Sequence, residues 1–109
     1  MFKPIASLTG GLFLAAALQA HAAPAPVTIR IDNFTFSPPV LVVPVGTTIT
    51  WVNQDDVPHT AVADDHKSFR SKPMDTDERY AFTFTSPGEY PYFCSIHPRM
   101  TAKIVVKAS

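Results

Sequence analysis

Short runs of alternating apolar and polar residues follow one another along most of the chain, separated by proline, glycine, asparagine and aspartate. This alternation is typical of strands, because successive side chains of a strand point to opposite faces. In the run 27–32, for example, Val27, Ile29 and Ile31 share one face. Eleven prolines disfavour long helices. The expected strands cover 27–32, 34–36, 40–43, 47–53, 59–63, 79–85, 89–94 and 101–107.

Seven or eight short strands at this spacing predict an all-β fold, a β-sandwich of one domain. We expect Ile49 and Trp51 to lie on the same face of one strand and to contribute to the core. Pro91 interrupts a strand-like run and has no N–H to donate, so its nitrogen should face an edge, a bulge or a neighbouring loop. The acidic segments 55–56, 64–65 and 75–78 are interpreted as solvated loops.

The first residues have the pattern of a secretory signal peptide. A short basic start that contains Lys3 precedes an apolar run over 5–18, and Ala20-His21-Ala22 matches an A-x-A cleavage site. The alternative is an uncleaved membrane anchor, but the apolar run is shorter than the ~20 residues that a span requires and it contains two glycines. We therefore expect a signal peptide over 1–22, a single mature domain over 23–109 without a membrane span, and a periplasmic location.

Charge and cysteine content restrict the function further. The chain has nine Lys and Arg and nine Asp and Glu, so it lacks the basic excess of a nucleic-acid-binding surface. Cys94 is the only cysteine, so no internal disulfide can form. A single cysteine in an oxidising compartment needs protection, either as an inert buried residue or as a ligand.

The surroundings of this cysteine favour a ligand. Cys94, His97 and Met100 stand at C-x2-H-x2-M spacing, and His59 lies upstream near another expected strand. Taken alone, His59 would be an ordinary surface histidine and Met100 a core residue. Two imidazoles, a thiolate and a weak axial thioether together form the ligand set of a blue-copper site, and zinc is a less specific alternative. We expect one copper ion that changes between Cu(I) and Cu(II), whereas His66 is expected to be a solvated loop residue.

The chain resembles the cupredoxins, the family of type I blue-copper proteins, and is most similar to the small amicyanin- and plastocyanin-type members. The similar segments include Val45-Gly46-Thr47, Thr50-Trp51-Val52-Asn53, Val57-Pro58-His59 and Pro87-Gly88-Glu89-Tyr90, followed by the cysteine loop. The resemblance implies an eight-stranded Greek-key β-sandwich. It also implies that His59, Cys94 and His97 are equatorial copper ligands and that Met100 is the long axial ligand.

The resemblance further implies that electrons leave through His97, at an apolar patch where a redox partner docks. Pro58, Pro98 and Met74 would surround this histidine. The partner would be a c-type cytochrome or a dehydrogenase or oxidase. Arg99 replaces an aromatic residue of amicyanin, which suggests an acidic or mixed partner surface.

Two further departures from the family pattern lie next to the expected ligands. Thr60 occupies a position where asparagine is frequent, and Ile96 occupies a position where amicyanin has proline. Because isoleucine retains its backbone N–H, we expect Ile96 to donate a hydrogen bond to the sulfur of Cys94.

Three functions are compatible with such a site. A soluble, monomeric electron carrier is the leading interpretation, and a copper carrier that delivers the ion to other proteins is the alternative. A copper enzyme is disfavoured, because the chain is short and has no second histidine cluster for a catalytic copper.

Overall fold

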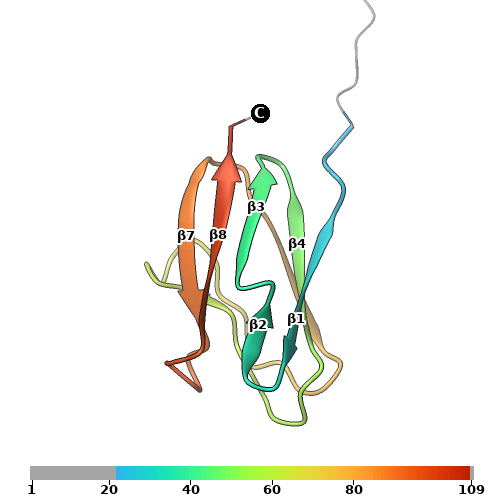
Figure 1. The fold of residues 1–109 in the computed structure, drawn as a ribbon, viewed down its shortest axis with the longest axis vertical. Coiled ribbons are helices and arrows are strands. Elements are labelled where there is room, and N and C mark those ends of the chain that lie inside the picture. The colour runs from blue at the N-terminus through green and yellow to red at the C-terminus, as the bar shows by residue number, and fades with distance from the viewer. Residues whose placement is uncertain (1–21, 109) are drawn as a thin grey trace, which may run out of the picture.

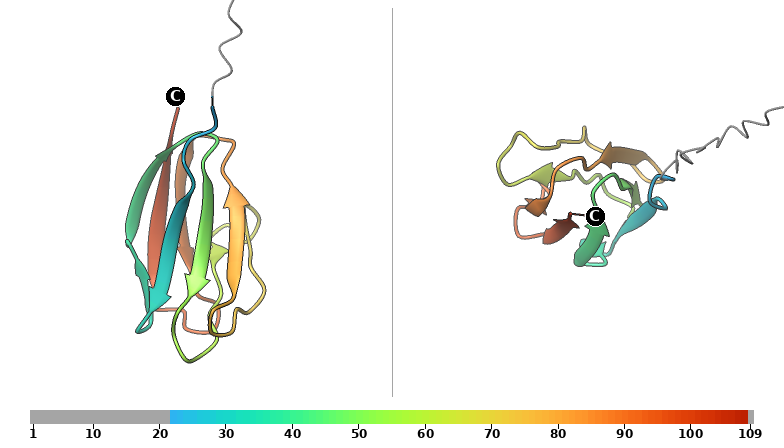
Figure 2. Two further views of the ribbon diagram at one scale, coloured as in Figure 1. Left: turned by 90° about the vertical axis from the view of Figure 1, so that its right-hand side faces the viewer. Right: turned by 90° about the horizontal axis from the view of Figure 1, so that it is seen from above.

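The computed structural model describes residues 22–108, which form two four-stranded sheets (Figures 1 and 2). The first sheet has the order β2-β1-β4-β6 and the second has the order β3-β8-β7-β5. Strand β1 runs parallel to β4, and β3 runs parallel to β8, whereas the other pairs are antiparallel. The expected all-β sandwich is therefore confirmed. The strands are β1 (Val27–Asp32), β2 (Thr35–Ser37), β3 (Val40–Pro44), β4 (Thr48–Asn53), β5 (Val62–Ala63), β6 (Arg79–Thr83), β7 (Gly88–Phe93) and β8 (Thr101–Lys107).

Much of the core consists of the inward-facing residues that the alternation predicts, and Phe69, from the segment between β5 and β6, adds a ring outside the expected strands. Ile29 of β1 lies opposite Trp51 of β4, and both side chains are fully buried. The Trp51 ring packs against the rings of Phe69, Tyr80 and Tyr92, with centroid distances of 5.2, 5.6 and 5.6 Å. Aromatic side chains bury large apolar areas, so this cluster ties the two sheets together.

Strand β5 is shorter than expected. Only Val62–Ala63 pairs with β7, whereas the preceding residues pair with a different segment. His59 and Met74 exchange two backbone hydrogen bonds of 3.1 and 2.8 Å, and Ser71 N–H donates to the carbonyl of Ala61 at 2.9 Å. This pairing holds His59 beside the 70–74 segment, away from the β5–β7 ladder.

Pro91 lies within β7, opposite Lys103 of β8. Its carbonyl accepts a hydrogen bond of 2.9 Å from the N–H of Asp64, just after the end of β5. The N and C=O of a strand residue point to the same side, so the Pro91 nitrogen faces this connecting segment. The expected position beside a neighbouring loop is confirmed.

Three connections gather at the end of the sandwich that lies opposite the C-terminus (Figure 1). These are the turn between β1 and β2, the segment that follows β4, and the loop between β7 and β8. Within residues 22–108, no helix is long and apolar enough to cross a membrane. The expected signal peptide, including His21, lies outside the described residues apart from its last position.

Candidate metal centre

The three strongest predicted ligands meet at this end of the sandwich. Cys94 follows β7 directly, and its Sγ lies 3.7 Å from Nδ1 of His59 and 3.7 Å from Nδ1 of His97. The three donor atoms all lie within 4.8 Å of one another. Cys94 and His59 are fully buried, whereas His97 is only partly buried. His66 is exposed and stands apart from this group.

The C-x2-H-x2-M spacing folds into a compact loop that is closed by its own backbone. His97 N–H donates to the carbonyl of Cys94 at 3.2 Å, and Met100 N–H donates to the carbonyl of His97 at 2.8 Å. Cys94 N–H in turn donates to the carbonyl of Met100 at 3.0 Å, so both ends of the loop are held together. Met100 is 6% exposed and belongs to the core. The loop therefore brings Cys94, His97 and Met100 to one end of the sandwich.

Thr60 connects the two segments that carry the histidine and the cysteine. Its N–H donates to Cys94 Sγ at 3.3 Å, and its hydroxyl lies 2.8 Å from the Ser95 hydroxyl. Ser95 N–H donates to Thr60 Oγ1 at 2.7 Å. Thr60, at the position where asparagine was expected, thus links the cysteine loop to the segment that carries His59.

The prediction that Ile96 N–H donates to Cys94 Sγ is wrong, because no such hydrogen bond is present among the described residues. The backbone donors directed at Cys94 Sγ are the N–H groups of Thr60 and His97. Ile96 instead presents its side chain to solvent and is 45% exposed.

The metal-free thiol of Cys94 is expected to ionise at unusually low pH. Burial raises its pKa, but hydrogen bonds from Thr60 N–H, from both imidazoles and from His97 N–H outweigh burial and lower the pKa to about 6. An unfolded cysteine has a pKa of ~8.5. This group should therefore stabilise the metal-free fold increasingly as the pH rises from about 6 to ~8.5, and that stability is lost below the folded pKa. Ultraviolet thiolate absorbance against pH should give a midpoint near 6. A midpoint at the unfolded value would contradict this prediction.

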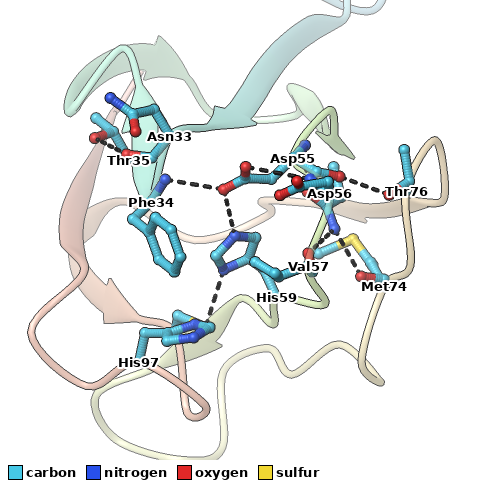
Figure 3. Close-up of polar contacts among 12 residues, drawn as sticks. Asn33, Phe34, Thr35, Asp55, Asp56, Val57, His59, Met74, Thr76 and His97 are labelled. Atoms are coloured by element: carbon cyan, nitrogen blue, oxygen red, sulfur yellow. Dashed lines mark hydrogen bonds and ion pairs between the residues drawn. The ribbon is translucent and has the colours of Figure 1, made fainter.

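Asp55 is buried and contacts a candidate ligand, so the interpretation of segment 55–56 as solvated is wrong for this residue. It is 8% exposed, and its Oδ2 lies 2.8 Å from Nε2 of His59 (Figure 3). The same oxygen accepts a hydrogen bond of 3.0 Å from Phe34 N–H. This backbone bond, followed by the bond with His59, lowers the pKa of Asp55 and keeps the carboxylate ionised. Because Nε2 is directed at this carboxylate, Nδ1 is the ring nitrogen of His59 that faces Cys94.

Asn53 fixes the backbone around this pair. Its side chain is fully buried, and Nδ2 donates to the carbonyls of Val57 and Met74 at 2.9 and 2.8 Å. Its Oδ1 accepts a hydrogen bond of 2.9 Å from Asp55 N–H. One amide therefore links the end of β4 to the segments on both sides of His59. In the sequence, Asn53 stands at the end of an apolar run. It was therefore interpreted only as the end of a strand, and its role in orienting the site was missed.

His97 borders an open apolar depression of about 500 Å³, lined by Phe34, Ile96, His97, Pro98, Arg99 and Met100. Phe34 is 48% exposed, and its ring makes edge contacts with both imidazoles, with centroid distances of 5.4 Å to His59 and 4.9 Å to His97. Figure 3 shows this ring beside the two histidines. Met74 was expected in this patch, but it is 3% exposed and packs in the core because its backbone pairs with His59. Phe34 provides the large exposed apolar side chain instead.

The donor set fits a single copper ion. Two imidazole nitrogens and a low-pKa thiol converge from the His59 segment and the cysteine loop. Nitrogen and sulfur donors of this kind suit copper, whereas harder ions prefer oxygen ligands. No other group of three or more His, Cys, Asp or Glu side chains over residues 22–108 is arranged to hold a metal ion.

Known proteins share the family and the fold of this chain. The Cupredoxin-like domain family matches residues 4–106. Amicyanin from Paracoccus versutus is 34% identical over 87 residues, which cover 74% of this chain and 64% of that relative. A purple cupredoxin from Nitrosopumilus maritimus superposes with a TM-score of 0.71 and 35% identity, covering 74% of this chain and 99% of that chain. A copper-containing nitrite reductase from Thermus scotoductus gives a TM-score of 0.72 and 41% identity, but the match covers 79% of this chain and only 23% of the enzyme.

Proposed function

Because the chain belongs to the cupredoxin-like family, we propose that it is a small blue-copper protein that passes single electrons between redox partners. The observation that carries the proposal is the convergence of His59, Cys94 and His97 within 4.8 Å. A bound copper ion supplies the electron chemistry by changing between Cu(II) and Cu(I). The chain spans 64% of the amicyanin that it matches. The similarity supports the proposed function, but it does not identify the redox partners of this chain.

In this proposal His59, Cys94 and His97 would hold the copper ion, with Met100 as a fourth, weaker ligand. The residues around them hold this arrangement before the metal arrives. Asp55 orients His59 through a 2.8 Å contact, and the closed backbone of the cysteine loop orients His97. A site that is already ordered needs little rearrangement when the ion changes its oxidation state, and this favours rapid electron transfer.

The partner is proposed to dock over His97. This imidazole is the partly exposed member of the candidate ligand set, and the depression beside it carries exposed Phe34 and Ile96. An apolar surface that surrounds a redox-active side chain lets a partner approach closely and exclude water. The protein is proposed to act as a monomer in the periplasm after removal of residues 1–22, with a cytochrome, dehydrogenase or oxidase as partner.

Three measurements on the copper-loaded protein test this function against copper delivery and against enzymatic activity. A carrier should give a reversible one-electron wave by cyclic voltammetry, and it should keep its copper when challenged with a Cu(I) chelator. Rapid loss of Cu(I) to the chelator, or an irreversible wave, would overturn the electron-carrier proposal. Steady turnover of nitrite with an added small-molecule reductant and no protein partner would favour an enzyme, although the matching nitrite reductase is more than four times the length of the matched part.

Replacement of Asp55 by asparagine is expected to raise the reduction potential. The Asp55 carboxylate stabilises Cu(II) through His59, and an amide of the same shape removes that negative charge. Each ~1.4 kcal/mol of lost stabilisation corresponds to ~60 mV for a one-electron couple, so we expect a rise of several tens of millivolts. Asp56→Asn is the matched control, because it removes the same charge from an exposed neighbour. Equal shifts in the two variants would show that the contact with His59 has no special effect.

A further inference from the structure

A second depression, with three cations among its lining residues, lies beside the metal centre. It has a volume of about 430 Å³, and Arg70, Lys72 and Arg79 supply its positive charges. The remaining lining residues are Pro73, Met74, Glu78 and Tyr80. We call this surface, defined by Arg70, Lys72 and Arg79, the basic groove.

The positive charges of the basic groove are not neutralised within the fold. All three side chains are exposed, and none takes part in an ion pair among the described residues. Glu78 is the only acidic lining residue, and its Oε1 accepts a hydrogen bond of 2.7 Å from Asp75 N–H in its own turn. Three cations around one concave surface repel one another, and an anionic partner would relieve that repulsion.

The basic groove is continuous with the apolar surface at His97. A third depression, of about 390 Å³, is lined by Arg70 and Lys72 at one side and by Ser95 and Ile96 at the other. Ile96 also lines the depression beside His97. A molecule seated over His97 therefore lies next to Arg99 and reaches the basic groove past Ile96.

We propose that the basic groove is the charged half of the docking surface and that it binds an acidic protein, with carboxylates placed beside that protein's own redox centre. The inference rests on the proposed function and adds the chemistry of the partner. Carboxylates in the groove would steer encounter and fix orientation, while the apolar half excludes water at His97. A concave groove that is joined to the apolar depression by a third depression fits a protruding acidic segment better than it fits a flat lipid surface.

Binding of an acidic probe tests the inference separately from electron transfer. The reduced, copper-loaded protein is titrated with a hexaglutamate peptide at low ionic strength, and amide chemical shifts are followed by NMR. We expect the largest shifts at 70–74 and at 79–80. The triple variant R70Q/K72Q/R79Q should bind the peptide at least fivefold more weakly, and added salt should produce the same loss.

A matched variant controls for net charge. K67Q/K103Q/K107Q removes three positive charges from residues that do not line the groove, and it should bind the peptide within twofold of the original protein. Equal weakening in both triple variants, or shifts spread over the whole surface, would overturn the inference. Binding to vesicles of phosphatidylglycerol in preference to the peptide would overturn it in favour of a membrane partner. Because the readout is peptide binding, it stays informative even if voltammetry rejects the electron-carrier function.

Discussion

Replacement of Cys94 by serine is expected to abolish the reversible one-electron wave and to weaken copper binding by at least a hundredfold. A serine hydroxyl stays protonated at neutral pH and offers a hard oxygen, whereas Cys94 offers a soft thiolate stabilised by hydrogen bonds. The change is nearly isosteric, so the metal-free variant should fold, with a free energy of unfolding that falls by less than ~2 kcal/mol. Voltammetry and competition with a copper chelator measure the first effect, and urea unfolding measures the second.

Ser95→Ala is the control for the Cys94 variant. It removes a hydroxyl from the adjacent position, but Ser95 N–H still donates to Thr60 Oγ1. This variant should keep the reversible wave. A Cys94→Ser protein that folds and still shows the original wave would exclude Cys94 as the central ligand.

Replacement of Asn53 by alanine is expected to lower the free energy of unfolding of the metal-free protein by ~2–4 kcal/mol. The substitution removes a fully buried amide and leaves the carbonyl of Val57 and the N–H of Asp55 without their partners. The carbonyl of Met74 keeps only its hydrogen bond from His59 N–H. An unsatisfied buried polar group costs ~1–3 kcal/mol, and part of that cost is recovered where water enters. The same change should loosen the segments around His59 and weaken copper retention.

Urea unfolding of the metal-free protein measures the Asn53 effect, and Gln54→Ala is its control. Gln54 is the next residue, and its exposed side chain accepts one hydrogen bond from Arg30. Exposed substitutions of this kind usually change stability by less than ~0.5 kcal/mol. If the two variants unfold at the same urea concentration, Asn53 does not anchor the metal site.

The alternation of apolar residues predicted most strands, because it depends only on which side chains must face the core. The prediction for β1 coincides with Val27–Asp32. The same rule predicted a strand that is longer than β5. His59–Ala61 pair with the 70–74 segment instead, and this pairing depends on contacts between loops. Local pattern predicts that a segment is extended, but it does not select the segment with which it pairs.

The spacing of Cys94, His97 and Met100 was informative because one short loop carries all three. The spacing gave no indication of the residues that orient these ligands. Asp55 resembles any acidic loop residue in the sequence, and its burial depends on the convergence of three segments, including the turn that supplies Phe34 N–H. Sequence spacing therefore identified candidate ligands, whereas the groups that orient them required the folded arrangement.

Phe34 illustrates the same limit within the first hairpin. Its apolar side chain suggested a continuing strand, but Asn33 and Phe34 form the turn between β1 and β2 with φ values of 51° and 57°. A bulky residue at positive φ is uncommon, and such conformations persist where surrounding contacts hold them. Here the N–H of Phe34 binds Asp55 and its ring contacts both imidazoles, so the turn forms one wall of the metal centre.

The most direct test of the central claim is a titration with Cu(II). The metal-free protein, with Cys94 as a free thiol, is titrated and its visible absorption spectrum is recorded. If Cys94 and the two histidines hold one copper ion, an intense charge-transfer band between thiolate and Cu(II) should grow linearly and saturate at one copper per chain. A protein with an intact Cys94 that binds copper without this band, or that saturates at a different stoichiometry, would contradict the account.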